Sequence, residues 1–275
     1  MDSGKERVNT VFIRNKMSDD DIGHEQGVRD FEFWYTYIFF ALVVIFFAVT
    51  NRLIKHYGTP KSSSSSVYDS WLWRNLSVSL LHGLLVGIWS IMSFFDHLED
   101  SPTIYEDPLY YFNTSSYLMM IASTAYFFYD AMDIVLSRVI KKNVEIIIHH
   151  FVILFSFGYY WHAKVGIGYA HLSLLAEFSS FLLHARKLTR IIGYSSDSLQ
   201  YHIFSIVNLV SFFILRLIPL SIVVSNIYPE YFLMRVHLFY FTTLSISAII
   251  IWIINIGFFL KLIRTDFIRL KQKRK

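Results

Sequence analysis

The chain has no cysteine among its 275 residues. Structural disulfides, thiolate zinc sites, iron–sulfur clusters and cysteine nucleophiles are therefore excluded. A glycine-rich phosphate loop and a Rossmann fingerprint are also missing, so the sequence does not indicate these nucleotide-binding folds. The repeated His-x-x-His-His boxes of membrane desaturases are absent too, which argues against a metal-dependent oxygenase.

Charged residues are scarce. They make up 17% of the chain, against about 25% in a typical soluble domain. Hydrophobic residues reach 54%, and the mean hydropathy is +0.43. The net charge is only +4, so nucleic-acid binding has little support. A chain this apolar indicates a polytopic membrane protein.

Long apolar runs specify the architecture, because about 20 apolar residues cross a bilayer as a helix. The predicted fold is therefore an all-α polytopic membrane protein with about seven transmembrane helices. The predicted spans are Phe33–Val49, Trp71–Phe95, Ser115–Val139, Val144–Trp161, Val165–His184, Ile203–Ser225 and His237–Ile263. A reading with six spans, in which the first helix lies in the interface, stays open.

Basic residues indicate the orientation, since loops rich in Lys and Arg stay in the cytosol. The loops after the first, third and fifth predicted helices, together with the tail, carry 16 Lys and Arg residues. The opposite loops carry only Lys164 and Arg235. The tail is therefore expected in the cytosol and the N-terminal segment on the other side.

Ionisable side chains inside the predicted spans mark a candidate site, because such groups are costly in a membrane and usually line a cavity. Helical rise places most of them roughly 7–13 Å above the cytosolic face, which predicts a lipid-binding or polar cavity open to the cytosol. A packing network of hydrogen bonds is the alternative. Arg216 is expected nearer the midplane, where Pro219 bends the helix toward it. The predicted polar-cavity residues are His82, Asp130, Asp133, His149, His150, Glu177, Arg216 and Asn255.

The order of these motifs resembles a known family. Asp130 and Asp133 end one helix, the pair His149-His150 opens the next, and Glu177 and Arg216 follow. This series resembles the TLC-domain family, and within it the membrane-fluidity-regulator subgroup of small, calfacilitin-like proteins. The resemblance covers about residues 65–265 and implies a six-helix TLC bundle. It leaves residues 1–31 as a polar, flexible N-terminal segment, 33–49 as a first transmembrane helix, and 266–275 as a basic cytosolic tail.

Resemblance to that subgroup implies a regulator of phospholipid composition and fluidity. Such a protein limits the incorporation of long-chain polyunsaturated acyl chains and promotes membrane rigidity. The implied partners are membrane lipids and acyl chains, with no cofactor and no metal.

The alternative is an acyl-CoA-dependent acyltransferase of ceramide-synthase type. His149 or His150 would then be the base, and Asp130 or Asp133 would orient it. Ceramide synthases carry a His-Asp-x-x-Asp run, however, where this chain has His171-Leu172-Ser173 and Glu177. That departure argues against ceramide synthase activity.

The last five residues suggest two locations. Lys271 and Lys273 stand fifth and third from the end and resemble a dibasic retrieval signal of the endoplasmic reticulum. The same basic residues could instead bind the anionic lipids of an inner leaflet. The subgroup resemblance favours the plasma membrane, with the endoplasmic reticulum as the second expectation.

Overall fold

A computed structural model describes residues 19–63, 66–96, 102–194, 198–233 and 237–265. Every regular element in these ranges is a helix, and six helices are long and apolar enough to cross a membrane. The predicted all-α polytopic fold is therefore confirmed. The elements are α2 (Asp19–Tyr57), η2 (Lys61–Ser63), α3 (Val67–Asp96), α4 (Thr114–Leu136), η3 (Ile140–Lys142), α5 (Val144–Ala163), α6 (Ile167–Leu174), α7 (Ala176–Ile191), α8 (Leu199–Phe212), η4 (Phe213–Leu217), α9 (Ile218–Ser225), α10 (Ile227–Leu233) and α11 (Leu238–Ile263).

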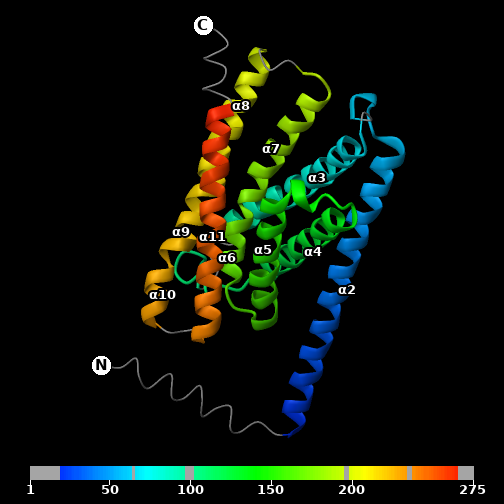
Figure 1. Cartoon of the computed structure of the whole chain (residues 1–275). Coiled ribbons are helices and arrows are strands. Elements are labelled where there is room, and N and C mark those ends of the chain that lie inside the picture. Colours follow the sequence, from blue (N-terminus) through cyan, green and yellow to red (C-terminus); the bar gives the residue numbers. More distant parts are fainter. Residues whose placement is uncertain (1–18, 64–65, 97–101, 195–197, 234–236, 266–275) are drawn as a thin grey trace.

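The first helix is longer than its apolar run. It begins at Asp19 and ends at Tyr57, so residues 19–31 of the predicted flexible segment are helical, and residues 1–18 lie outside the described part. Figure 1 shows α2 running along the outside of the bundle. Only 6% of the residues in the most apolar part of its span, Trp34–Tyr57, are buried inside the protein, against 67% in the span of α4. α2 therefore presents most of its apolar surface to lipid, and α4 is the central helix.

The fifth predicted span is folded as two shorter helices, α6 and α7, which break at Leu175. In Figure 1 they follow one another from the end of the bundle near α10 to the end where α8 begins. Together they make one passage through the bundle between α5 and α8. The seven predicted passages are therefore present, six as long helices and one as this broken pair.

The sixth predicted span contains a second irregularity. A π-helical turn, η4, separates α8 from α9 and holds Arg216. Pro219 follows at the start of α9. Proline cannot donate the backbone hydrogen bond that would continue a regular helix, and π-turns inside helices often occur at functional sites. The predicted bend at Pro219 thus takes the form of a change in helical pitch.

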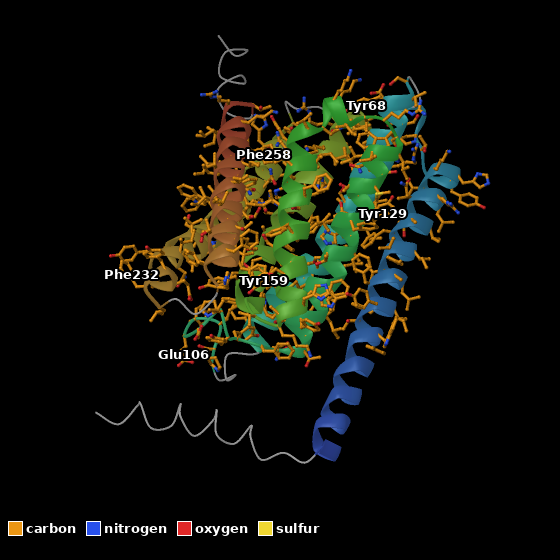
Figure 2. The ribbon with its side chains drawn as sticks, turned by 60° about the horizontal axis from the view of Figure 1, so that its bottom comes forward. Tyr68, Glu106, Tyr129, Tyr159, Phe232 and Phe258 are labelled. Atoms are coloured by element: carbon orange, nitrogen blue, oxygen red, sulfur yellow. The ribbon has the colours of Figure 1, made fainter. Side chains whose placement is uncertain are left out.

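The two ends of the bundle differ. Figure 2 shows Tyr68, at the start of α3, at one end, and Glu106 and Phe232 toward the other. The loop before α4 and the helix α10 therefore lie at the same end, as alternating passages require. We call this the α10 end and its opposite the tail end.

Candidate functional site

Two glycines bring α3 against α7. A Cβ on Gly83 would lie 2.8 Å from the backbone nitrogen of Phe181, and one on Gly87 would lie 2.6 Å from the Cα of Phe178. Glycines four residues apart allow membrane helices to approach at backbone distance. His82 directly precedes Gly83, so this contact holds His82 opposite Glu177.

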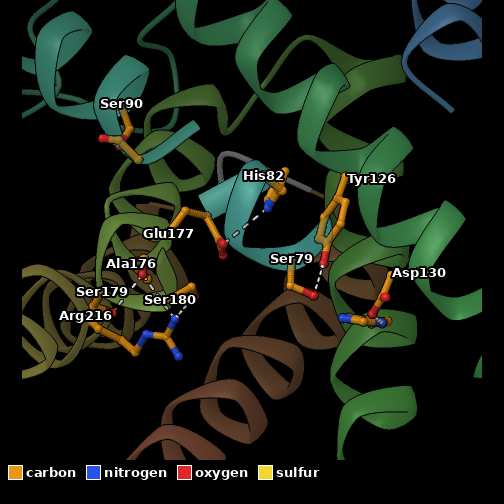
Figure 3. A network of polar contacts seen from close by, with 12 residues as sticks. Ser79, His82, Ser90, Tyr126, Asp130, Ala176, Glu177, Ser179, Ser180 and Arg216 are labelled. Atoms are coloured by element: carbon orange, nitrogen blue, oxygen red, sulfur yellow. Dashed lines mark hydrogen bonds and ion pairs between the residues drawn. The ribbon is translucent and has the colours of Figure 1, made fainter. Parts of the chain in front are cut away.

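His82 and Glu177 form the first buried pair. The Nδ1 atom of His82 lies 3.4 Å from Oε2 of Glu177, and the His82 side chain is 1% exposed. The imidazole stacks on the ring of Tyr126 with a centroid distance of 3.7 Å. Tyr126 in turn donates a hydrogen bond to Ser79 on α3 (Figure 3). The pair is thus fixed by α3, α4 and α7 together.

His150 and Asp130 form the second buried pair. His150 Nδ1 lies 3.4 Å from Oδ2 of Asp130, and both side chains are about 5–6% exposed. Asn75 on α3 donates a hydrogen bond to the other oxygen of Asp130. The ring of Phe127 lies between the pairs, with its centroid 5.4 Å from those of both His82 and His150. Two imidazole–carboxylate pairs therefore flank one aromatic ring inside the bundle.

Arg216 forms the third polar group. Its guanidinium donates to Oδ1 of Asn255 at 3.1 Å, to the carbonyl of Ala176 at 3.0 Å, and to the hydroxyl of Ser180. Figure 3 shows the guanidinium reaching α7 beside Ser180 and Ala176. The expected separation of Arg216 from the other polar residues is therefore not observed, because it joins α7 and α11 close to Glu177.

Asp133 belongs to a different contact. Its carboxylate accepts hydrogen bonds from Trp71 Nε1 at 2.7 Å and from Asn51 Nδ2 at 3.2 Å. It therefore ties α2 and α3 to α4. Although Asp130 and Asp133 are three residues apart, they serve separate interfaces.

A cleft among α5, α6, α7, α9 and α11 holds about 740 Å³ of empty space, including its open part. Of the eight predicted residues, His149, Glu177, Arg216 and Asn255 line it, whereas His82, Asp130, Asp133 and His150 do not. Ile153, Phe157, Leu220 and Ile251 form much of the remaining wall. The cleft is thus polar at one end and apolar along its length.

The cleft continues toward the α10 end. A second space of about 480 Å³ shares Tyr160, Tyr169, Val223, Leu244 and Ala248 with its lining. At the α10 end this second space is bordered by Asn226 and Glu230. The opening of the cavity toward the cytosol stays a prediction, and the second space lies on the α10 side of the cleft.

Some residues of the site were not singled out as site residues from the sequence. Asn75 and Tyr126 complete the polar contacts, and the hydroxyl of Ser156 adds to the lining. Ser173 and Ser180, which the sequence marks as hydroxyls near the charged residues, lie in the lining and beside Arg216 respectively. Ser180 lies three residues after Glu177, one helical turn away, and this spacing is the signal that points to it. Asn75 and Tyr126 carry no such local signal.

The described residues contain no group of three or more His, Asp and Glu side chains arranged to hold a metal ion. The site brings several ionisable side chains together. These are two imidazole–carboxylate pairs, one guanidinium and one imidazole, His149, that faces the cleft.

Comparison with known proteins gives a consistent result. A family model described as the TLC domain matches residues 72–264. TLC domain-containing protein 2 of Danio rerio is 28% identical over 229 residues, which are 83% of this chain and 89% of that protein. TLC domain-containing protein 1 of Homo sapiens is 30% identical over 224 residues, or 80% and 86%. TLC domain-containing protein 4-B of Xenopus laevis is 22% identical over 184 residues, 66% of each chain. No solved structure matches the sequence.

Proposed function

The chain belongs to the TLC-domain family, and from this membership and the geometry of the cleft we propose that it binds lipid acyl chains and regulates phospholipid composition. In this role it limits the incorporation of long-chain polyunsaturated acyl chains and makes the membrane more rigid. Its partners are membrane lipids. The family membership suggests the regulation of phospholipid composition, and the cleft suggests the binding of acyl chains.

The observation that carries the proposal is the shape and polarity of the cleft. Glu177 and Arg216 lie at one end of the lining, and apolar side chains such as Ile153, Leu220 and Ile251 form the wall along its length. A lining that is mostly apolar with a few polar groups is typical of small-molecule sites, and this one matches a polar head and a hydrocarbon tail. A packing network would bury its polar groups in close-packed contacts, whereas His149 and Arg216 border open space.

Lipid analysis of cells tests the proposal. Cells that lack the protein should gain polyunsaturated species in their phospholipids and show lower membrane order than cells in which the wild type is restored. Unchanged lipid composition and unchanged order would contradict the proposal.

A matched pair of variants connects this effect to the cleft. Ala248→Trp places an indole in the shared lining and should fail to restore the lipid composition. Ile246→Trp, on the same helix, changes a side chain that is 52% exposed and should restore it. If both variants restore the lipid composition equally, the cleft is not needed for the regulation of phospholipids.

An acyltransferase is the second candidate, and the position of His149 favours it. Its imidazole lines the cleft, and its Nδ1 has no hydrogen-bond partner among the described residues. A neutral imidazole in this position could act as a general base on an acyl acceptor. Purified protein supplied with labelled acyl-CoA and a lipid acceptor tests this reading. If the wild type transfers the labelled acyl group and the His149→Gln variant does not, the protein is an acyltransferase and the regulator proposal is overturned.

We place the protein in the plasma membrane, with the endoplasmic reticulum as the alternative. The basic tail that bears on this choice, including Lys271 and Lys273, lies outside the described residues. Replacing both lysines by Ser in a tagged protein distinguishes the two locations. Surface location of both the wild type and the variant supports the plasma membrane. A reticular wild type whose variant moves to the surface identifies a retrieval signal.

A further inference from the structure

Arg216 is a buried cation whose hydrogen-bond acceptors are all neutral. Its side chain is 9% exposed, and the groups that accept its hydrogen bonds are an amide, a backbone carbonyl and a hydroxyl. A guanidinium has five N–H donors, and these contacts use three of them. The Nε atom has no partner among the described residues. A charge buried in a membrane protein normally has an opposite charge beside it. Here Glu177 interacts electrostatically with Arg216 but is not among the groups that accept its hydrogen bonds.

Glu177 acts on Arg216 without direct contact. Both side chains line the same end of the cleft and interact electrostatically, but the Glu177 carboxylate lies 3.4 Å from the imidazole of His82 on α3. No ion pair within 4.0 Å joins Glu177 to Arg216 in the described structure. The guanidinium therefore has no carboxylate in direct contact with it.

The residues that line the cleft and the adjoining space lead away from Arg216 toward the α10 end. They recur every three or four residues along each helix, so that one face of α5, of α9 and of α11 borders the space. On α11 the stripe runs from Asn255 to Phe241, and at 1.5 Å per residue these 14 steps span about 21 Å. One leaflet of a bilayer core is about 15 Å deep. The path is thus long enough for a long acyl chain.

We infer that the cleft binds a free long-chain fatty acid, with its carboxylate on Arg216 and its chain directed toward the α10 end. This inference rests on the proposed function in that it takes the cleft as an acyl-chain site, and it adds the head group. A carboxylate matches a guanidinium whose direct acceptors are all neutral and whose Nε has no hydrogen-bond partner among the described residues, and it can accept two parallel N–H bonds. His149 borders the same end and adds a second polar contact. An acyl-CoA carries several phosphate charges, and the cleft offers one Arg and no Lys in its lining.

Comparison of two ligands with the same chain tests the inference. Purified full-length protein in phosphatidylcholine nanodiscs is titrated with oleate and with methyl oleate, each displacing a fluorescent fatty acid. Oleate is expected to bind about tenfold or more tightly than the ester, because only the acid presents a charge to the buried guanidinium. Equal affinities would overturn the inference while leaving acyl-chain binding, and hence the proposed function, in place.

Variants locate the head group. Arg216→Gln should weaken oleate binding about tenfold or more, toward the affinity of the ester, and leave the ester unchanged. Arg264→Gln, an exposed arginine at the end of α11, serves as the matched control and should bind oleate like the wild type. If Arg216→Gln does not fold, Arg216→Lys keeps the charge but loses the planar fork and should show a smaller loss. Undiminished oleate binding in a folded Arg216 variant would place the carboxylate elsewhere. Failure of both ligands to bind the wild type would remove the acyl-chain site itself.

Discussion

His149 and His150 are adjacent in the sequence but have different surroundings. Successive residues on a helix point about 100° apart. His149 therefore lines the cleft, whereas His150 turns toward Asp130. The first imidazole can meet a ligand, and the second stabilises the contact between α5 and α4.

This difference predicts opposite effects for the same substitution. His150→Gln removes a buried imidazole that contacts Asp130 at 3.4 Å and should lower the free energy of unfolding by about 1–3 kcal/mol. His149→Gln should cost less than about 1 kcal/mol, because this side chain borders the cleft and contacts no carboxylate there. Apparent Tm values of the two variants in detergent check the stability effect. Displacement of a bound fatty acid should respond to His149→Gln alone. Equal destabilisation by both variants would contradict these roles.

Trp71 and Trp73 offer a second contrast at this scale. The indole of Trp71 donates to the carboxylate of Asp133 at 2.7 Å, whereas Trp73 donates to the carbonyl of Gly58 at 2.8 Å near the surface. Hydrogen bonds to charged groups contribute about 1.5–3 kcal/mol, and neutral ones about 0.5–1.5 kcal/mol. Trp71→Phe should therefore lower the apparent Tm more than Trp73→Phe does. The reverse order would show that Asp133 does not hold α2 and α3 in place.

At the scale of helices, the close contact of α3 with α7 decides the site. The contact exists because Gly83 and Gly87 have no side chain to separate the helices. It places His82 opposite Glu177 and so holds the Glu177 carboxylate at the polar end of the cleft. The break at Leu175 and the π-turn at Phe213–Leu217 then bring the carbonyl of Ala176 and the guanidinium of Arg216 together.

Alanine at these glycines should therefore force the helices apart. A Cβ on Gly87 would lie 2.6 Å from backbone atoms of Phe178, and overpacking of this kind costs about 1–3 kcal/mol or more. Gly158→Ala and Gly257→Ala are the matched controls, since nothing lies within 4 Å of the added Cβ. Removal of a helical glycine should stabilise these controls by about 0.5–1 kcal/mol. Thermal unfolding of the four variants tests the contrast, and a Gly87→Ala variant as stable as Gly158→Ala would contradict it.

For the whole molecule, the charge distribution and the helix order agree on one orientation. Basic residues gather in the loops after α2, α4 and α7 and in the tail, whereas the segment from Asp96 to Asp107 carries five acidic residues and no base. Glu106, in the described part of that segment, lies toward the same end as Phe232 of α10 in Figure 2. The positive-inside rule then assigns the α10 end to the outer or lumenal side.

The absence of cysteine makes this orientation easy to test. A single cysteine at Tyr105, which is 60% exposed, should react with a membrane-impermeant maleimide from outside intact cells if the protein is in the plasma membrane. A cysteine at Lys141, in the loop after α4, should react only after the membrane is permeabilised. Labelling in the opposite pattern would reverse the orientation, and the unmodified chain is the unlabelled control.

Hydrophobic length, charge and helical period are local properties, and from them the sequence determined the helical class, the positions of the spans and the polar residues within them. The relative rotation of the helices was decided only by tertiary packing. Asp130 and Asp133 share a face by spacing, yet one pairs with His150 and the other with Trp71. His82 meets Glu177 because two glycines let α3 approach α7. Arg216 reaches Asn255 across 39 residues through a π-turn that has no clear local signal. A sequence specifies the depth of each side chain along its own helix, but the partner on the next helix depends on how all the helices fit together.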